Sequence, residues 1–495
     1  MTNDINGAMR RATTLALGVP LLCAVAISMH ATTVTVTNTN DSGPGSLRQA
    51  LADANDHDTI TFSVTGTIGL TSGELLVNKV ITISGPGAAS LALDGNGNSR
   101  VFHIGSRRPV SISGLTITNG NGASGGGGAI WNDHGALTLN NCAVDFNRTA
   151  YLAGGIYNDG SNGTATTTIL NSTVSGNFAS YAGGGIYNDA SDGGRATLTI
   201  MNSTINTNGA WYDDIPFGGG EGGGIYNDSG SLMITNSVVS NNHAGMDGPN
   251  FPTGTGGGIS NYGTLTITDS AITGNQVYLF GGGIYNDGTL AINNSTVSDN
   301  GAIGQHDGDP WGTGGGVVNS GTLTITNSTL SGNGASLSGG GIEGTSTLEN
   351  TILNANSPEN ILGGAVSRGY NLSSDDGGGY LNGPGDQINT DPMLGPLQDN
   401  GGSTLTHALL PGSPAIDAGN PNFTPPPFYD QRGLDFYRVR NGRIDKGSFE
   451  VRAGSTPAPT STPRPAPTPR PRATPCPCPS PPHSLTMEWN DYVCR

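Results

Sequence analysis

The chain has 495 residues, 81 of them glycine, and a formal net charge of −17 at pH 7. Glycine at this level would suggest a low-complexity chain on composition alone, but an in-phase repeat in the middle of the sequence overrules that interpretation. So acidic a chain also argues against a nucleic-acid partner, because the phosphate backbone would be repelled.

Residues 1–31 have the pattern of a secretory signal peptide. An arginine pair precedes an apolar stretch over residues 15–27, and cleavage fits after Ala26 or after Ala31. A twin-arginine signal is the weaker alternative. No second apolar stretch approaches membrane-spanning length. We therefore expect a secreted or cell-surface protein with no transmembrane helix in the mature chain.

We assign residues 34–118 to an amino-terminal cap and to the first coils of the repeat described below. The string Ser42-Gly-Pro-Gly-Ser-Leu-Arg-Gln-Ala-Leu51 resembles the CSLREA motif that opens many bacterial β-helix proteins, with Gly45 at the Cys position. Ser46 can cap a short helix, and its apolar residues Leu47, Ala50 and Leu51 would cover the open first coil. A stacked fold needs such a cap because its end otherwise exposes unpaired strand edges.

Residues 119–356 repeat one phrase, a variant of Gly-Gly-Gly-Ile-Tyr-Asn-Asp, eight times. The copies are led by Ile130, Ile156, Ile186, Ile225, Ile259, Ile284, Val317 and Ile342, at steps of 26, 30, 39, 34, 25, 33 and 25 residues. Between copies, short runs rich in Thr, Val and Ile alternate apolar and polar residues, which predicts short strands. Three such strands per period, separated by Asn/Asp/Gly turns, predict a single-stranded right-handed parallel β-helix of roughly eleven coils. We expect the protein to be a monomer.

A second set of positions supports this register. The residues at one turn of each period are Asn141, Asn171, Asn202, Asn236, Asp269, Asn294, Asn327 and Asn350. Each is followed by a small residue, and another Asn comes six positions later. Asn tolerates left-handed turns, and stacked amides can hydrogen-bond from coil to coil. We assign these side chains, among them Asn171, Asn202, Asn236, Asn294 and Asn327, to a structural ladder. Cys142 occupies the small position of its coil, which predicts a buried, inert thiol.

The paired phrases Gly-Gly-(Gly/Ala)-Ile and (Val/Ile/Leu)-x-x-Asn resemble the repeats of the chlamydial polymorphic outer-membrane protein family and of many secreted right-handed β-helices. The resemblance covers about residues 110–356. The family's Phe before x-x-Asn is replaced here by Val, Ile or Leu. The resemblance therefore implies the architecture and not a pathogenic adhesin.

Residues 357–452 contain Asp391-Pro-Met-Leu-Gly-Pro-Leu-Gln-Asp-Asn-Gly-Gly402, Leu410-Pro-Gly-Ser-Pro-Ala-Ile-Asp-Ala-Gly419, Asp430-Gln-Arg-Gly433 and Asp445-Lys-Gly-Ser-Phe-Glu450. This order resembles the choice-of-anchor Q domain, which precedes assorted cell-surface attachment signals. Lys446 stands where relatives carry a small or apolar residue.

Residues 453–495 form a Pro-rich spacer of polyproline type followed by a short tail. No Leu-Pro-x-Thr-Gly sorting signal is present. Cys476, Cys478 and Cys494 could form one disulfide outside the cell, leaving one thiol over.

The three longest loops, at 209–221, 243–255 and 301–313, project from one corner of the coil, the usual place for binding on a solenoid. Aromatic faces beside carboxylates suit sugar rings, although the same aromatics could simply pack the loops onto the body. The ligand-binding candidates are Trp211, Tyr212, Phe217, Phe251 and Trp311. The carboxylates beside them, which are weak catalytic candidates, are Asp213, Asp214, Asp247, Asp307 and Asp309.

The repeated phrase also predicts an outer aromatic row, because the residue after each inward Ile points outward. This row comprises Trp131, Tyr157, Tyr187 and Tyr226; the same position in the later copies holds Ser260, Tyr285, Val318 and Glu343. It could be a polysaccharide platform, but mutual stacking that reinforces the scaffold is the favoured interpretation.

Charge separates the enzyme classes that occur on this fold. Residues 110–356 carry no Lys and only Arg148 and Arg195 against 17 acidic side chains. A lyase needs a base and cations to neutralise a uronate, so a lyase is disfavoured. A glycoside hydrolase needs only two facing carboxylates, and it remains the alternative to a binding or structural protein.

We therefore expect a secreted, adhesin-like β-helix that binds a polysaccharide or a cell-surface glycan, with no catalytic residue identified. We also expect no cofactor. Oxygen-rich loops suit calcium, but the sequence contains no nonapeptide calcium repeat and no helix–loop motif.

Overall fold

The structure is a computed structural model that describes residues 31–122, 125–211, 220–246, 253–306 and 309–452. Contacts divide the chain into one compact unit that ends at Ala453 and a second from Gly454 to Arg495. The second unit, with the Pro-rich spacer and Cys476, Cys478 and Cys494, lies outside the described residues, as does the predicted signal peptide up to residue 30.

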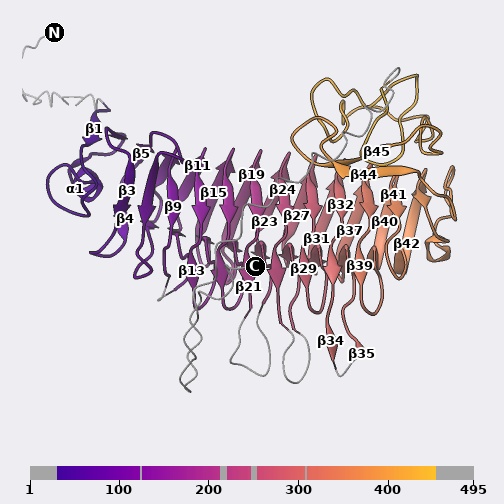
Figure 1. The fold of residues 1–495 in the computed structure, drawn as a ribbon, viewed down its shortest axis with the longest axis horizontal. Helices are drawn as coiled ribbons and strands as arrows, with labels where there is room; N and C mark the ends of the chain where they lie inside the picture. Colours follow the sequence, from indigo (N-terminus) through magenta and orange to yellow (C-terminus); the bar gives the residue numbers. More distant parts are fainter. Residues whose placement is uncertain (1–30, 123–124, 212–219, 247–252, 307–308, 453–495) are drawn as a thin grey trace, which may run out of the picture. The chain divides into compact units, whose positions relative to one another are not determined.

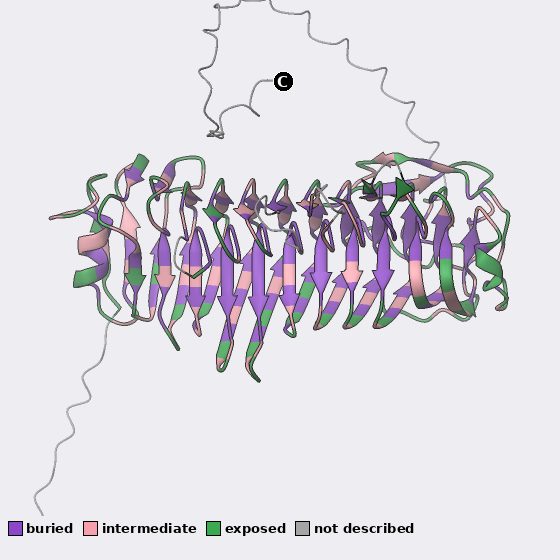
Figure 2. Cartoon of the chain, turned by 90° about the horizontal axis from the view of Figure 1, so that it is seen from below, coloured by how far each residue is buried: buried purple, intermediate pink, exposed green. Residues whose placement is uncertain are grey.

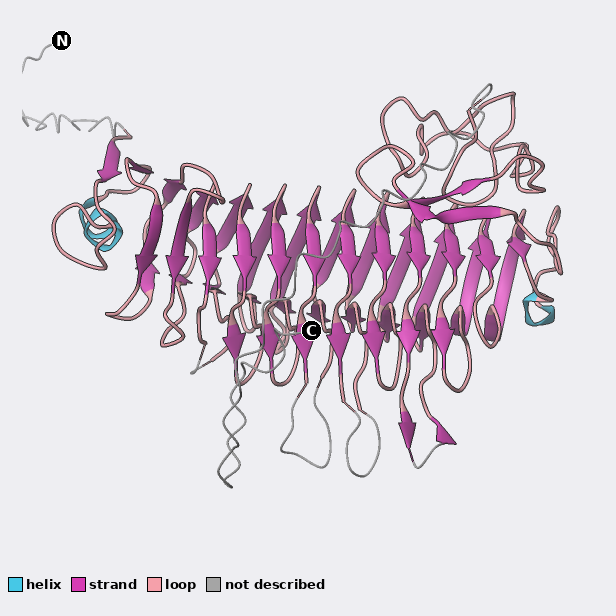
Figure 3. Ribbon diagram, in the orientation of Figure 1, coloured by secondary structure: helices cyan, strands magenta, loops and turns pink. Residues whose placement is uncertain are grey.

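The first unit is a right-handed parallel β-helix, as predicted (Figure 1). Three parallel sheets run along it, which we name sheet A (22 strands), sheet B (12 strands) and sheet C (7 strands). One coil shows the plan in order: β30 (Ile284–Asn286), β31 (Thr289–Asn293), β32 (Thr296–Ser298) and β33 (Gly301–Ala302). A coil in the middle of the stack therefore has four strand segments, not three, because sheet A takes two strands around a corner (Figure 3).

The interior is filled by the alternating apolar residues of these strands. The leading residues of the repeated phrase, from Ile130 to Ile342, are fully buried, and burial follows the strands while exposed residues gather at the turns (Figure 2). The register is strict: Ile156 of β14 (Ile156–Asp159) pairs with Ile186 of β18 (Ile186–Asp189). Identical positions stack at ~4.8 Å per coil.

The glycines before each leading Ile are required by the close approach of neighbouring coils. A Cβ on Gly184 would lie 2.3 Å from the carbonyl oxygen of Gly209, and Gly183 has φ +65°. Only glycine fits both the contact and the left-handed backbone without strain. The repeated triple glycine is therefore a packing requirement of the stack.

Two rows of buried asparagines hold the coils together from within. In the first, the Asn177 side chain donates from Nδ2 to Oδ1 of Asn208 at 2.9 Å, and the Asn177 backbone N–H donates to the same oxygen. In the second, the repeated phrase itself supplies the amides, and Asn158 Nδ2 donates to Asn188 Oδ1 at 2.7 Å. The Asn of the phrase thus points inward and bonds to the next coil.

The amino-terminal end carries the predicted cap. Helix α1 (Leu47–Asp53) begins after Ser46, whose side chain accepts a hydrogen bond from the Gln49 backbone N–H, and Leu47, Ala50 and Leu51 are buried. At the other end the stack continues past Asn356. Strand β42 (Ile361–Gly369) pairs with β40 (Ile342–Glu349), and β43 (Leu372–Ser373) pairs with β41 (Ile352–Asn354). The coil persists because Ile361 and Leu372 fill core positions after the glycine phrase has gone.

The last described part, residues 394–452, forms a lobe that packs on sheet B. It contains an antiparallel pair, β44 (Leu394–Gln398) and β45 (Thr406–Leu409). Gln431 accepts from Thr296 of β32 at 2.6 Å, and the Ser448 backbone N–H donates to Thr329 of β38 (Thr329–Ser331). The lobe therefore covers the outer face of sheet B over the later coils. No helix among the described residues is long and apolar enough to cross a membrane.

Candidate functional site

A line of aromatic rings runs along the outer face of sheet C, at the base of the long loops. We name it the sheet C aromatic strip: Phe178, Trp211, His243 and Tyr278. Neighbouring ring centroids lie 4.7, 5.6 and 5.4 Å apart, each pair in an edge-to-face arrangement. All four side chains are half-buried, so each keeps part of its surface in solvent.

The strip follows from the backbone of sheet C, whose strands are two residues long. Its seven strands are β13 (Arg148–Thr149), β17 (Phe178–Ala179), β21 (Gly209–Ala210), β25 (His243–Ala244), β29 (Gln276–Val277), β33 (Gly301–Ala302) and β39 (Gly334–Ala335). The second residue of each strand from Ala179 to Ala302 is fully buried, so the first points outward. At two of the outward glycines, Gly209 and Gly301, a later side chain folds back over the glycine, whereas a Cβ on Gly334 would meet nothing within 4 Å. A Cβ on Gly209 would lie 2.1 Å from the Trp211 ring, so Gly209 makes room for the indole.

The strip ends beside a small apolar patch at the third long loop, which we name the hairpin patch: Ile303, Trp311 and Leu337. Their exposed fractions are 42%, 42% and 50%. The Trp311 backbone N–H donates to the Gly304 carbonyl oxygen, and Leu337 N–H donates to Gly312, which places the three residues on neighbouring turns. The antiparallel pair β34 (Gln305–His306) and β35 (Asp309–Pro310) projects beyond them (Figure 1). Exposed apolar groups gathered in this way are typical of binding surfaces.

Of the ligand-binding candidates from sequence, the structure describes Trp211 and Trp311. Trp211 lies against Phe178 and His243, so its ring packs on the helix body while part of it stays in solvent. Tyr212, Phe217 and Phe251 lie outside the described residues, as do the carboxylates Asp213, Asp214, Asp247 and Asp307. Asp309 is described and exposed, on β35.

Three members of the strip were not among the sequence candidates: Phe178, His243 and Tyr278. Two of them can be recognised from their place in the repeat. Phe178 directly follows Asn177, and His243 directly follows Asn242, the buried asparagines of their coils. The third follows the same rule as Trp211 and Ile303, which stand two residues after the outward position of sheet C. An alignment of the repeats on the second asparagine places Phe178 and His243 one position after it, and Trp211 and Tyr278 three positions after it.

The aromatic row predicted from the repeated phrase is present on sheet A, and it is tied into the scaffold. We name it the sheet A aromatic row; its rings are Trp131, Tyr157, Tyr187, Tyr226, Tyr262 and Tyr285. Tyr157 and Tyr187 are only 8% and 7% exposed. Burial raises the pKa of both phenols well above the usual range, and neighbouring carboxylates add to the shift.

Each of the first three rings bonds to a carboxylate of the next coil. The Tyr157 hydroxyl donates to Asp189 at 2.6 Å, and Tyr187 donates to Asp228 at 3.0 Å. In the same pattern, Trp131 Nε1 donates to Asp159 at 3.1 Å. The loop residues Leu152, Ala153 and Ala182 pack over these rings. Mutual reinforcement therefore describes the row better than an open platform, as favoured from sequence.

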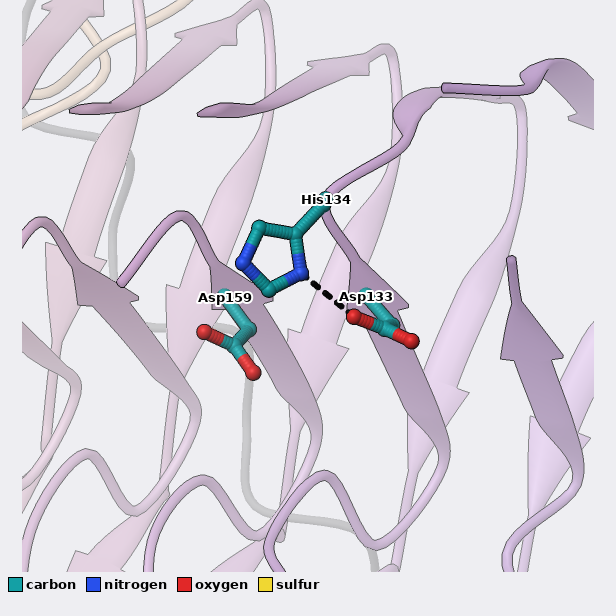
Figure 4. Close-up of side chains that lie close together, drawn as sticks. All are labelled: Asp133, His134 and Asp159. Atoms are coloured by element: carbon teal, nitrogen blue, oxygen red, sulfur yellow. Dashed lines mark hydrogen bonds and ion pairs between the residues drawn. The ribbon is translucent and has the colours of Figure 1, made fainter. Parts of the chain in front are cut away.

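A network of charged side chains occupies the amino-terminal end of that row, and Figure 4 draws three of its members, Asp133, His134 and Asp159. Arg100 and His103 both bond to Glu74, at 2.7 and 3.1 Å, and His103 stacks on Trp131 with ring centroids 4.4 Å apart. The second ring nitrogen of His103 lies 3.4 Å from Asp133. Because both nitrogens face carboxylates, the ring is best satisfied as the charged imidazolium, and the hydrogen bond to Glu74 raises the pKa of His103.

His134, like His103, has an oxygen acceptor beside each of its two ring nitrogens. Its Nδ1 lies 2.5 Å from Asp133 and its Nε2 lies 2.7 Å from the carbonyl oxygen of Ser161. Burial opposes the charge, but the hydrogen bonds to Asp133 and to Ser161 outweigh it and raise the pKa of His134. Asp133, His134 and Asp159 lie close enough to bind a metal. A metal needs a free imidazole lone pair, whereas both nitrogens of His134 point at oxygen acceptors, so the group does not fit a metal.

The asparagines assigned to a structural ladder lie at one corner between sheets A and B, all with left-handed backbones: Asn171, Asn202, Asn236, Asn294 and Asn327. Asn202 Nδ2 donates to Asn171 Oδ1 at 3.3 Å, and Asn236 donates to Asn202 at 2.6 Å. Asn294 and Asn327 are buried under the lobe. Cys142, at the neighbouring small position, is buried, and burial raises the pKa of its thiol.

Neither a protein-family model nor a curated protein matches this sequence. Solved structures of similar form include pectate lyase Pel9A, with 16% identity over 86% of this chain and 98% of that chain and a TM-score of 0.41. A mutant of the PL6 family alginate lyase AlyGC has 14% identity over 86% of this chain and 60% of that chain, with a TM-score of 0.40. ORF18 of Geobacillus virus E2 has 13% identity over 68% and 61%, with a TM-score of 0.38. Likenesses at this level carry no information on activity.

Proposed function

We propose that the protein is an exported, surface-held β-helix that binds a neutral polysaccharide along the sheet C aromatic strip without cleaving it. The observation that carries this proposal is the strip itself: Phe178, Trp211, His243 and Tyr278 in consecutive ring contacts, each partly in solvent. Aromatic rings offer an apolar face and, in Trp and Tyr, a polar group at the edge, which is the combination that a sugar ring requires.

The geometry of the strip suits a linear chain. Successive coils stack at ~4.8 Å, so successive rings follow the helix axis and a polymer lying along them would meet one ring after another. The hairpin patch of Ile303, Trp311 and Leu337 extends the apolar surface further along the same sheet. Several weak contacts on a rigid surface add up to a higher affinity, because binding requires little further ordering of the protein.

Charge supports a neutral ligand. The whole chain carries −17 at pH 7, and this net charge disfavours an acidic polysaccharide. The sheet C strip itself contains His243, whose pKa is lowered by burial, so it adds no positive charge near neutral pH. A neutral glucan, mannan or xylan is therefore favoured over pectin or alginate.

Binding is favoured over cleavage by how the described acid–base groups are engaged. Glu74, His103, Asp133 and His134 are paired with one another, and the carboxylates Asp189 and Asp228 accept from buried tyrosines. A glycoside hydrolase acting through Asp213, Asp214, Asp247, Asp307 or Asp309 stays the alternative, and the same experiment tests it.

Export and attachment belong to the proposal as well. The signal-like residues 1–31, the anchor-like segment 357–452 and the Pro-rich spacer after it support a protein displayed at a cell surface. In such an arrangement the spacer would hold the β-helix away from the envelope, where its strip could reach a polymer.

The test is a glycan array on the mature full chain, followed by a reducing-sugar assay on every polysaccharide that binds. We expect binding to neutral polysaccharides, its loss in Trp211→Ala, and no release of reducing ends. Phe146→Ala is the matched control, because Phe146 is an aromatic that is 65% exposed and lies outside the strip. Release of reducing ends that disappears in Asp309→Ala or Asp213→Ala would establish the hydrolase instead.

A further inference from the structure

A group of three carboxylates lies inside the carboxy-terminal lobe, away from the strip. Oxygens of Asp417, Asp445 and Glu450 all lie within 4.8 Å of one another. Asp445 and Glu450 are 1% and 2% exposed, and Asp417 is half-buried, so the group opens toward solvent on one side. Three carboxylates this close are costly to bury unless something compensates their charge.

The hydrogen bonds of the group leave oxygen lone pairs for a further ligand. Asp445 accepts from the backbone N–H groups of Asp417 and Val451, at 2.6 and 2.7 Å, one on each oxygen. Glu450 accepts from the Asp445 N–H on Oε2, whereas its Oε1 is buried and has no hydrogen-bond partner among the described residues. A buried carboxylate oxygen without a partner is rare and points to a missing ligand.

The arginines near the group leave the Glu450 Oε1 without a hydrogen bond. Arg432 is engaged by Asp430 through several hydrogen bonds. Arg438 is fully buried beside the group and supplies one positive charge, but its Nε and Nη1 also have no partner in the described part of the chain. Arg432 and Arg438 both attract Glu450 electrostatically, but neither donates a hydrogen bond to its Oε1. Burial and the neighbouring Asp445 accordingly raise the pKa of Glu450 to about 9.

We propose that Asp417, Asp445 and Glu450 form a binding site for one divalent cation, with calcium as the fitting ion. Calcium takes carboxylate oxygens in flexible geometry and accepts further waters, and the half-exposed Asp417 leaves it an entry path. The site differs from the oxygen-rich long loops where calcium was considered from sequence. It lies where two stretches of the lobe meet, because the Gly419 N–H donates to the Ile444 carbonyl oxygen.

The cation would fasten the lobe to the β-helix. The carbonyl oxygen of Asp445 accepts from the side chain of Asn350, at the end of the corner asparagines. The backbone N–H of Gly447 donates to the carbonyl oxygen of Asn350 as well. A cation that holds Asp445 in place therefore stabilises the contact between lobe and stack, and its removal would loosen the lobe first.

The test is calorimetric titration of calcium into the metal-stripped mature full chain, with the midpoint of thermal unfolding measured in calcium and in EDTA. We expect one site per chain with a dissociation constant of about 10⁻⁴–10⁻³ M, as in extracellular calcium modules, and an unfolding midpoint that rises by a few degrees in 10 mM calcium. Asp417→Asn should weaken binding at least tenfold. Asn tolerates the left-handed backbone at this position, where φ is +51°.

Asp435→Asn is the matched control, since it removes the same charge from an exposed position of the same lobe. We expect it to keep the calcium affinity. The proposal would be overturned if up to 10 mM calcium gave the unmodified chain neither binding heat nor a shift of the unfolding midpoint. A proton on Glu450 would then be what offsets the negative charge of the group. Equal calcium affinity in Asp417→Asn and in the unmodified chain would also overturn it, because the ion would then lie elsewhere.

Discussion

The molecule carries two lines of aromatic side chains, and the contrast between them separates scaffold from surface. In the sheet A aromatic row, Tyr157 and Tyr187 are buried and their hydroxyls are bound to carboxylates of the next coil. In the sheet C aromatic strip, Trp211 and Tyr278 keep part of their rings in solvent, and the strip lies below the long loops. An aromatic repeat is therefore not by itself a binding surface. It becomes available for binding only where no loop packs over the rings.

The largest expected effect concerns the sheet A row. Tyr187→Ala removes a buried ring that contacts Tyr157 and Tyr226, and we expect it to lower the free energy of unfolding by about 3–5 kcal/mol. Denaturant unfolding measures this, with Phe146→Ala as the exposed aromatic control, which should cost less than ~1 kcal/mol. Polysaccharide affinity of the folded variant should stay unchanged. A folded Tyr187→Ala protein that no longer binds would reverse the roles of the two lines.

The next effect is on binding through the sheet C strip. Trp211→Ala should weaken polysaccharide affinity by about 2 kcal/mol, roughly 30-fold in the dissociation constant, as for a central aromatic at an interface. Affinity electrophoresis in gels containing the polysaccharide measures the change. The unfolding midpoint should move far less than in Tyr187→Ala, because the Trp211 ring is partly exposed to solvent whereas Tyr187 is buried. An unchanged mobility shift would remove the strip from the binding surface.

An effect of similar size tests the hydrogen bonds between coils. Tyr157→Phe keeps the ring and removes only the hydroxyl that donates to Asp189 at 2.6 Å. It leaves a carboxylate that is 5% exposed with one donor fewer, so we expect a loss of about 1.5–3 kcal/mol in unfolding free energy, as for a hydrogen bond to a charged group. The same change at Tyr278, Tyr278→Phe, serves as the control from the exposed strip and should cost less than half as much.

The smallest effect is a dependence of stability on pH that arises at the end of the sheet A row. The folded state raises the pKa of His103 and of His134, so their stabilisation is fully present below about pH 6.5, the unfolded value. It is lost as pH rises through the folded pKa values. The unfolding midpoint of the unmodified chain, minus that of the His103→Gln/His134→Gln variant, should therefore fall as pH rises above about 6.5.

The difference between the two proteins is the useful quantity, because two other histidines act in the opposite direction. Burial lowers the pKa of His243 and of His407, so their contribution grows as pH rises. Both are present in the unmodified chain and in the variant and cancel in the subtraction. A difference that stays flat with pH would contradict the charged state assigned to His103 and His134.

The fold could be predicted because the same pattern of core and turn residues occurs in eight copies of the repeat. Each copy of the phrase places an Ile in the core and a glycine where coils touch, so an error in one copy is corrected by the others. The terminal cap was predictable for a local reason, since Ser46 and the apolar side of the helix after it are neighbours in sequence. The fourth strand of each coil was missed because β33 and its equivalents are only two residues long.

The parts that could not be predicted depend on contacts between distant residues. The lobe binds sheet B through pairs such as Thr296 and Gln431, which are 135 residues apart and carry no pattern that links them. The histidines looked scattered in the sequence, yet His103 and His134 both bond to Asp133, because coil lengths that vary between periods hide which residues become neighbours. The three loop segments with most of the candidate carboxylates lie outside the described residues.

The central claim is that the sheet C strip, and not the sheet A row, binds a polysaccharide. The most direct measurement is a crystal structure of the mature protein with an oligosaccharide of whichever neutral polysaccharide binds on the array. We predict electron density for sugar rings along Phe178, Trp211, His243 and Tyr278, with an intact chain. Sugar density over Tyr157 and Tyr187 alone, or a cleaved oligosaccharide held between loop carboxylates, would contradict it.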